Sequence, residues 1–388
     1  MSEPIWLGPR SPSQAEWREM QEIVGSSLGN YHTLEERVEG MVADIVKRPF
    51  AIAFGSTGSA IEAALDALGV ARSSPAGVPE IIVPSLAPAA LGAAAMHSGA
   101  TVVYADVDAK TLTLRASGAE PCITAATRAI VGVAAHGQPA GLDELAALAA
   151  RNEIPLLEIV SGGLGGHIGR DPVGRFGRVS VIGLGTHEST VGSGGAICVT
   201  NDDSLAKALR LIRNMGRSEP KSDWERMGGV RPLERVGIDS RLSPLQAALA
   251  EVRLHRFATT CETLEGVTHA YLRRLAMHPD LVLPAPCADG TVRWSHFAVR
   301  LSERFNRDDR DSIIQGLLRH DIAATSVLYV LPAEPAFAAT ATRAEFRIAQ
   351  RAADRLIALP FSTALSERDI DLICQTLQVM IERQTILR

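Results

Sequence analysis

The chain has 388 residues, 46% of them hydrophobic, and a formal net charge of −5 at pH 7. This length and composition predict a large domain with a sizeable core plus a smaller one. The acidic balance and the scattered Lys and Arg residues argue against a nucleic-acid partner. The five cysteines are odd in number and far apart, which predicts neither disulfides nor a metal site. We find no basic leader and no long uncharged apolar segment, so we expect a cytoplasmic protein that does not act at a membrane.

Seven short β-rich runs alternate with helical patterns between residues 50 and 215. The runs are FAIAF, EIIVP, TVVYAD, RAIVGVAA, IPLLEIV, RVSVIGL and GAICVT. Alternation of strand and helix is typical of a mostly parallel sheet that is covered on both faces. Ligands of such sheets bind beyond the carboxyl ends of the strands, so we expect the site near Glu158, Ser161 and the polar crossing at 183–188.

The second half of the chain predicts a long helix, NDDSLAKALRLIRNMG, that Asn201 or Asp202 can cap. A glycine- and proline-bearing loop follows near 216–244, and the pattern then becomes that of a smaller α+β unit. We therefore divide the chain into a large domain, residues 1–250, and a small domain, residues 251–388.

The stretch FGSTGSAIEAAL predicts a strand that leads into small residues and then into a helix. A turn of this kind aims the free N–H groups of Thr57, Gly58 and Ser59, together with the helix dipole, at a negatively charged group. An ordinary N-cap without a ligand accounts for the same residues, so the stretch alone does not decide between the two interpretations.

The arrangement as a whole resembles the DegT/DnrJ/StrS sugar aminotransferase family of fold type I pyridoxal-phosphate (PLP) enzymes, over nearly the entire chain. The resemblance is carried by GSTGSAIEAALDALGV, HGQPAGLDELAALAARNEIPLLEIVSGGLGG, GSGGAICVTNDDSLAKALRLIRNMGR and VGIDSRLSPLQAALAEVRL. It implies an α/β fold with a three-layer, aminotransferase-like large domain that has an N-terminal arm and a seven-stranded, mostly parallel sheet. It also implies a smaller C-terminal α+β domain and a homodimer with shared active sites.

Several residues depart from what the resemblance implies for the cofactor site. His187 stands at the position of the Schiff-base lysine, and Ile159 at that of the aspartate that binds the pyridine nitrogen. Gly162 replaces a glutamine near the cofactor, Ile182 a phosphate-binding serine, and Asp239 an asparagine that crosses from the other subunit. The stacking aromatic is also lost in VPSLAP. Because aminotransfer needs the lysine and the acidic partner, we expect that the site has lost PLP and that the chain uses no cofactor.

The leading hypothesis is a PLP-independent enzyme of natural-product or sugar biosynthesis in which His187 acts as general acid or base. Glu158 and Glu188 are the candidates for orienting the imidazole or for a second proton transfer. The substrate implied by the resemblance is a small molecule: a sugar, an aminocyclitol or a related intermediate. The predicted substrate-binding residues are Gly58, Ser59, Ser161, Gly162, Thr186, Asp239, Arg241 and Tyr329, with Asp239 and Arg241 expected from the other subunit.

Two other hypotheses stay open. A branch of the family, the sugar 3-dehydratases, is similar in using histidine at the lysine position. This leaves room for a dehydratase or aminotransferase that depends on PLP or on pyridoxamine phosphate (PMP). The third hypothesis is a catalytically inactive pseudoenzyme that acts as an auxiliary subunit, because a lone histidine is often structural.

Overall fold

The computed structural model describes residues 4–8, 11–27, 32–70, 77–185, 190–220, 222–326, 328–338 and 346–386. Its helices are α1 (Gln14–Ser27), α2 (His32–Val46), α3 (Thr57–Ala67), α4 (Ala89–His97), α5 (Ala116–Ala119), α6 (Leu142–Arg151), α7 (Asp203–Arg213), α8 (Asp223–Arg226), α9 (Pro244–His255), α10 (Phe257–Leu275), α11 (Arg307–Leu318), α12 (Arg347–Ala353) and α13 (Glu367–Ile386). Its strands are β1 (Phe50–Phe54), β2 (Glu80–Pro84), β3 (Leu86–Ala87), β4 (Thr101–Ala105), β5 (Thr127–Ala134), β6 (Leu156–Val160), β7 (His167–Ile168), β8 (Asp171–Pro172), β9 (Val179–Gly183), β10 (Ala196–Thr200), β11 (Leu281–Val282), β12 (Gly290–Thr291), β13 (Phe297–Leu301), β14 (Tyr329–Val330) and β15 (Leu356–Leu359).

Seven strands form the central sheet, in the order β1-β10-β9-β6-β5-β2-β4. They coincide with the seven runs that the sequence predicts. Strands β4, β2, β5, β6 and β9 are mutually parallel, whereas β10 is antiparallel to both of its neighbours, β9 and β1. The predicted α/β fold class with a seven-stranded, mostly parallel sheet is therefore confirmed.

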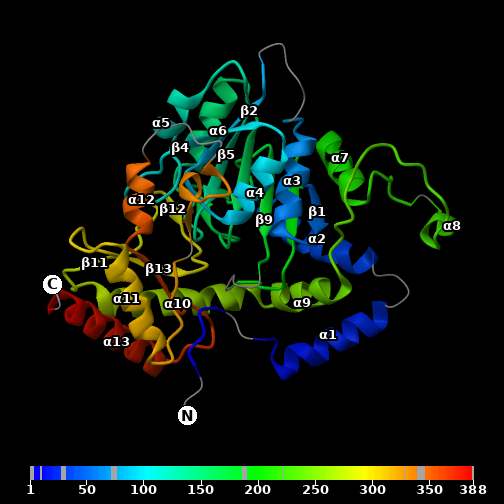
Figure 1. The fold of residues 1–388 in the computed structure, drawn as a ribbon. Coiled ribbons are helices and arrows are strands. Elements are labelled where there is room, and N and C mark those ends of the chain that lie inside the picture. Colours follow the sequence, from blue (N-terminus) through cyan, green and yellow to red (C-terminus); the bar gives the residue numbers. More distant parts are fainter. Residues whose placement is uncertain are drawn as a thin grey trace.

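Both faces of the sheet are buried, because apolar side chains along each strand alternate between two layers of helices. In β1, Ile52 and Phe54 belong to a hydrophobic cluster shared with α3, α4 and α7. Ala51 and Ala53 point the other way, into a cluster shared with α2 and α9. Figure 1 shows the sheet strands enclosed between these helices, which makes three layers.

The C-terminal unit has its own core, built on the antiparallel sheet β11-β13-β15 and on α10, α11 and α13. Tyr271 stacks on Phe297 with ring centroids 4.6 Å apart and 16° between the planes. Helices α9 and α10 follow one another directly and run from the large sheet to this unit (Figure 1). The expected division at residue 250 falls inside α9, and that division stays a prediction.

The first described residues are bonded to the C-terminal unit. The N–H of Ile5 donates to the carbonyl of Asp321 (2.8 Å), and the N–H of Ala323 donates to the carbonyl of Ile5 (2.9 Å). The N–H of Phe361 donates to the carbonyl of Leu7 (2.8 Å). Helix α1 then packs on α9. The N-terminal segment therefore joins both units of the chain.

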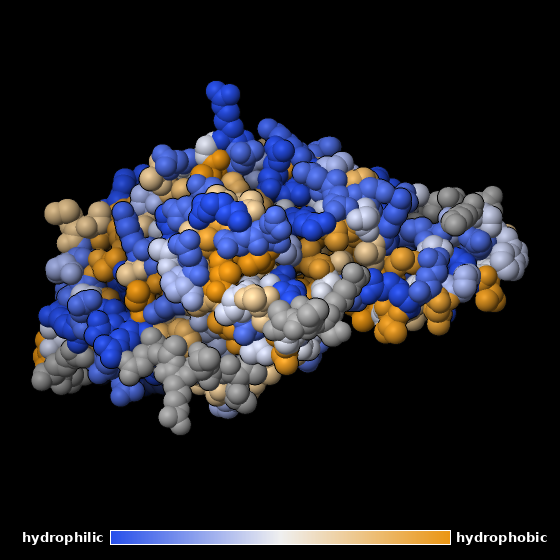
Figure 2. Space-filling model, turned by 90° about the horizontal axis from the view of Figure 1, so that it is seen from above, coloured by the Kyte–Doolittle hydropathy of each residue, from blue (hydrophilic) through white to orange (hydrophobic). Residues whose placement is uncertain are grey.

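The chain between α7 and α9 projects from the body and carries the short helix α8 (Figure 1). Five apolar side chains along it, each between 61% and 90% exposed, form what we call the apolar strip: Trp224, Met227, Val230, Leu233 and Val236. Figure 2 shows hydrophobic side chains gathered on this projection. A strip of this kind is typical of a surface that binds another protein.

The described residues can also be searched for disulfides, membrane-spanning helices and metal-binding groups. All five cysteines are free thiols. Among the helices that the structure describes, none combines the length and apolar character needed to cross a bilayer. Within the same residues no group of three or more His, Cys, Asp or Glu side chains is placed to hold a metal ion.

Candidate functional site

The carboxyl edge of the sheet meets the start of α3, which follows β1. Ser56 is the N-cap: its backbone is extended (φ −151°, ψ 156°), and its Oγ accepts a hydrogen bond from the N–H of Ser59 at 3.1 Å. The other N–H groups of the first turn have no partner within a helix. A Cβ on Gly58 would meet no atom within 4 Å. Open space before a helix N-terminus is suited to bind an anion.

A second segment, residues 237–242, closes one side of this helix start. The N–H of Gly55 donates to the carbonyl of Ser240 at 2.9 Å, and Ser59 Oγ lies 2.6 Å from Ser240 Oγ. A Cβ on Gly55 would lie 2.9 Å from the carbonyl oxygen of Arg241. The close approach therefore requires glycine at this position. Ser240 was not among the predicted site residues, although it directly precedes one of them.

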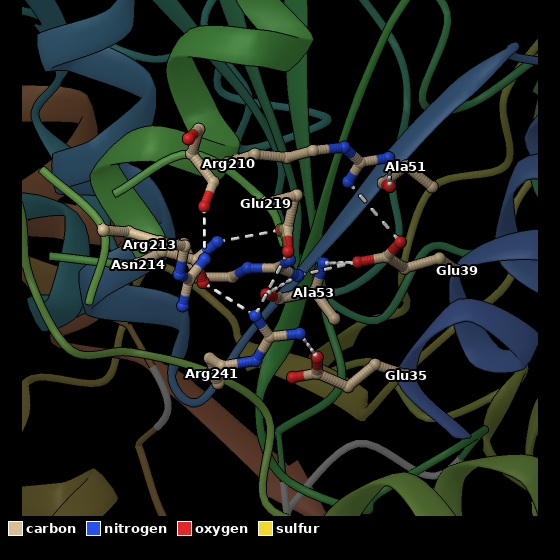
Figure 3. Close-up of polar contacts among 11 residues, drawn as sticks. Glu35, Glu39, Ala51, Ala53, Arg210, Arg213, Asn214, Glu219 and Arg241 are labelled. Atoms are coloured by element: carbon tan, nitrogen blue, oxygen red, sulfur yellow. Dashed lines mark hydrogen bonds and ion pairs between the residues drawn. The ribbon is translucent and has the colours of Figure 1, made fainter. Parts of the chain in front are cut away.

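Arg241 holds that segment from behind through buried polar contacts (Figure 3). Its guanidinium donates to Asn214 Oδ1 at 2.8 Å and pairs with Glu35 and Glu219. Burial raises the pKa of Glu35, although the neighbouring Arg213 and Arg241 guanidinium groups oppose the rise. The structure commits the Arg241 side chain to partners in its own chain. Its predicted contact with substrate in the other subunit stays a prediction.

The same network reaches the central sheet (Figure 3). Glu39, on α2, accepts a hydrogen bond from the N–H of Ala53 in β1 at 2.8 Å and pairs with Arg213 at 2.8 Å. Arg213 also pairs with Glu219 at 2.7 Å. Because opposite charges alternate through the network, no full charge in it stands isolated, as burial requires. Helices α2 and α7, strand β1 and residues 237–242 are thereby held together behind the start of α3.

Glu158, in β6, is fully buried and turned toward the segment before β9. Its Oε1 accepts from the N–H of Gly174 at 2.7 Å. Its Oε2 accepts from the N–H groups of Phe176 (2.9 Å) and Gly177 (3.0 Å) and from Ser180 Oγ (2.7 Å). These four bonds give the carboxylate a structural role in shaping this turn. Its predicted part in proton transfer at His187 stays a prediction.

Beyond β6 the chain packs against the segment 293–296 of the C-terminal unit. Gly162 has a positive φ of 74°, and a Cβ there would lie 2.0 Å from Ser295 Cβ. Ser295 Oγ donates to the carbonyl of Ser161 at 3.5 Å. The contact leaves no room for a larger side chain at residue 162.

Two histidines that the sequence analysis did not select lie at the same edge. The rings of His136, which follows β5, and His296, which precedes β13, are 5.7 Å apart and 71° inclined. Ser295 donates its N–H to the carbonyl of His136 at 3.1 Å, and its Oγ lies 3.0 Å from His296 Nδ1. Burial, with a smaller contribution from His296, lowers the pKa of His136 to about 3. Its Nε2 is buried without a hydrogen-bond partner. A histidine directly after the apolar run RAIVGVAA was the available signal.

The remaining predicted residues are only partly placed. Asp239 is exposed and forms a backbone bridge with Asn214. Tyr329 is 48% exposed, and its backbone pairs with Ala87 beside the carboxyl end of β2. Outside the described residues lie Thr186, His187 and Glu188. The described residues therefore bring together Gly58, Ser59 and Ser240 at the helix start, while Ser161 and Gly162 pack on Ser295.

A three-layer α/β body with this helix start at the carboxyl edge of its sheet, beside a small α+β unit, defines a fold type I aminotransferase architecture. The chain belongs to the DegT/DnrJ/EryC1/StrS aminotransferase family, whose model matches residues 13–378.

Three similar proteins illustrate the relation. GDP-perosamine synthase of Caulobacter vibrioides is 29% identical over 359 residues, 92% of each chain. The erythromycin biosynthesis sensory transduction protein EryC1 of Saccharopolyspora erythraea is 30% identical over 363 residues, again 92% of each chain. Among solved structures, Spr1654 of Streptococcus pneumoniae, assigned as a sugar aminotransferase, superposes in its PMP form with a TM-score of 0.86 at 19% identity, covering 99% of both chains.

The prediction that the chain uses no cofactor is wrong. Similar solved structures are named as sugar aminotransferases, and the Streptococcus pneumoniae protein was solved in both PMP and PLP forms. These findings point to PLP rather than to the absence of a cofactor. The prediction weighed lost side chains, whereas backbone N–H groups at a helix start bind phosphate whatever side chains surround them.

The described residues fit such a cofactor at one end. The space before Gly58, with the hydroxyl groups of Ser59 and Ser240 beside it, is suited to a phosphate. At the position that the family pattern gives to the pyridine-binding aspartate, Ile159 is buried in the hydrophobic cluster around α3. The phosphate end is therefore polar and open, and the opposite end is apolar.

Proposed function

We propose that this chain is a sugar-biosynthetic enzyme that binds PLP or PMP noncovalently, with His187 in place of the Schiff-base lysine. Its substrate would be a nucleotide-linked sugar, an amino sugar or an aminocyclitol. The proposal rests on one observation: the open, capped helix start at Gly58, which offers an anion site to the phosphate of the cofactor. Family membership and the sugar-linked names of the relatives support it.

When bound, PLP or PMP supplies an electron sink for charge that develops beside the reacting nitrogen. The free N–H groups of Thr57 and Gly58 would hold the phosphate and orient the cofactor, while the N–H of Ser59 caps the helix through Ser56 Oγ. Arg241 and its buried partners hold residues 237–242, and so Ser240, against that phosphate site. Ile159 keeps water from the far end. His187 takes up or returns a proton at the reacting carbon, since an imidazole titrates near neutral pH.

Binding of PMP and of PLP, followed by absorbance and by thermal shift, tests the proposal. We expect saturable spectra that dialysis abolishes, and no fixation of PLP by borohydride at residue 187, because imidazole forms no Schiff base. Gly58→Asp places a carboxylate before the phosphate and should weaken binding about tenfold or more. Gly40→Asp, at an exposed position of α2 where a Cβ also meets no atom within 4 Å, makes the same change away from the site and should bind normally. A flat spectrum and an unchanged melting temperature with both compounds would overturn the proposal.

Turnover tests the role of His187 separately. A panel of nucleotide-linked keto sugars with an amino donor provides substrates. We expect His187→Gln to keep PMP binding and to lose turnover by a factor of about 10² to 10⁴, the usual contribution of a positioned acid or base. Wild-type protein that binds PMP but turns over none of the panel would favour the auxiliary-subunit hypothesis instead.

We also propose that a second copy of the chain covers the apolar strip. The strip leads directly into residues 237–242, so a partner seated on it would lie beside the site. Val230→Asp should shift the protein toward monomer in sedimentation velocity. Met277→Asp changes another exposed apolar side chain, on the far unit, and serves as control. A wild-type monomer at all concentrations would refute this part of the proposal.

A further inference from the structure

A pocket of about 340 Å³ opens between α10 and residues 286–294. It shares no lining residue with the helix start at Gly58. Thr190, the first described residue after the crossing that carries His187, lines the pocket and is 5% exposed. A pocket of this size is within the range of small-molecule sites.

The charges on the pocket wall decide which ligands it can take. Arg293 lines the pocket, but its Nη1 already pairs with Glu265 Oε2 at 3.0 Å. The two formal charges cancel, so the wall offers a diphosphate no net attraction. Both side chains are polar, although the Nε of Arg293 is itself buried and makes no hydrogen bond. The wall is therefore polar without being cationic, in contrast to the start of α3.

The other lining groups are mixed: hydroxyls, the imidazole of His269, the thiols of Cys261 and Cys287, and apolar and aromatic side chains. Thr190, Thr268 and Thr291 contribute hydroxyl groups, and Trp294 a broad ring. Thr268 Oγ1 donates to the carbonyl of Leu264 at 2.9 Å, which leaves its lone pairs to accept from a ligand. These groups suit a ring that carries many hydroxyl groups. Each ring hydroxyl can donate and accept hydrogen bonds with the threonines and with the Arg–Glu pair, and the aromatic face can pack against the ring itself.

The wall that carries these groups is fixed in place. A Cβ on Gly137 would lie 1.8 Å from the carbonyl oxygen of Arg293, so the wall backbone packs directly on the loop after β5. Beyond Trp294, the N–H of Ser295 donates to the carbonyl of His136 at 3.1 Å. A preformed wall binds its ligand at a lower ordering cost.

We propose that this pocket binds a neutral, polyhydroxylated ring, a sugar or cyclitol unit of the substrate, and leaves any diphosphate outside it. This inference rests on the proposed function, because it takes the bound ring to be part of the substrate of that reaction. It assigns Thr268, Trp294 and the Arg293–Glu265 pair to recognition of that ring.

Ligand-observed NMR with myo-inositol, glucose and uridine diphosphate on the full chain tests the assignment. We expect saturable signals from the two neutral rings, and no displacement of them by uridine diphosphate. Thr268→Val and Trp294→Phe should each weaken ring binding about tenfold. Thr263→Val, on the exposed side of the same helix, should leave it unchanged.

PMP absorbance measured in the same variants separates this inference from the proposed function. Thr268→Val and Trp294→Phe should bind PMP as the wild type does, which also shows that they fold. Loss of PMP binding in the wild type would defeat the proposed function while leaving ring binding measurable. The inference fails if neither neutral ring binds at tens of millimolar, if uridine diphosphate displaces them, or if both variants bind them normally.

Discussion

Glu158→Gln is expected to destabilise the protein strongly although it exchanges one oxygen for a nitrogen. The carboxylate accepts four hydrogen bonds, from three backbone N–H groups and from Ser180 Oγ, at 2.7 to 3.0 Å. A glutamine side chain has one acceptor oxygen, and its NH₂ group cannot accept. If the oxygen takes the Oε2 position, the NH₂ group faces the N–H of Gly174, and two donors oppose each other in a buried site.

The magnitude follows from these contacts. One buried N–H left without a partner costs about 1–3 kcal/mol, and a neutral acceptor in place of a charged one weakens each remaining bond by roughly 1 kcal/mol. Relief from burying a charge offsets part of this loss. We therefore expect the free energy of unfolding to fall by about 3 kcal/mol.

Urea unfolding measured by circular dichroism tests this, together with amide hydrogen exchange at Gly174, Phe176 and Gly177, which should accelerate. Glu262→Gln makes the same chemical change at an exposed position of α10 and serves as control. If both variants unfold at the same urea concentration and the three amides exchange at wild-type rates, the carboxylate does not hold the turn and the reasoning is refuted.

Three further predictions concern the same edge of the sheet and are checked by urea unfolding. Gly162→Ala, whose Cβ would clash, should cost more than the about 1–2 kcal/mol of backbone strain alone. Gly169→Ala, at φ +56° in open space, should cost only that strain, and equal losses would contradict the close packing. His136 has a pKa of about 3 in the folded protein against 6.5 ordinarily. The unfolded chain therefore takes up the proton first, and stability should fall by about 1.4 kcal/mol per pH unit as the pH drops below 6.5. His136→Gln should flatten that fall, and an unchanged slope would contradict the neutral imidazole. Arg241→Met should lower the free energy of unfolding by about 3–5 kcal/mol, because it leaves the buried Glu35 unpaired. Adding Glu35→Gln to this variant should recover part of the loss. If the losses of the two single variants simply add in the double variant, Arg241 and Glu35 do not interact.

The fold could be predicted because its signals are local. Runs such as RAIVGVAA and IPLLEIV are apolar throughout, as strands buried on both faces must be. The helix cap at Asp202, one of two candidates, is visible in the sequence and accepts from the N–H groups of Ser204 and Leu205. Periodicity and capping depend on neighbours in the sequence, so a single chain suffices to find them.

The site could be predicted only in part because partners distant in sequence decide what a charged side chain does. The Glu158 carboxylate accepts hydrogen bonds from a turn that begins sixteen residues later in the sequence. Arg241 pairs with Glu35, which lies near the other end of the large unit in the sequence. The sequence around Glu158 and around Arg241 does not predict these partners. His136 shows the converse: its position after a strand was visible, but its neutrality follows from burial beside His296.

The threading of Ile5 and Leu7 into the C-terminal unit has a consequence for biosynthesis. The ribosome makes these residues before the large sheet, whereas their backbone partners at Asp321, Ala323 and Phe361 are made after it. The segment with Ile5 and Leu7 therefore has none of these partners while the large sheet is made, and it can dock only after the C-terminal unit has followed. Domains generally fold in order as they are synthesised; here the C-terminal unit is completed by a segment that precedes the large sheet in the chain.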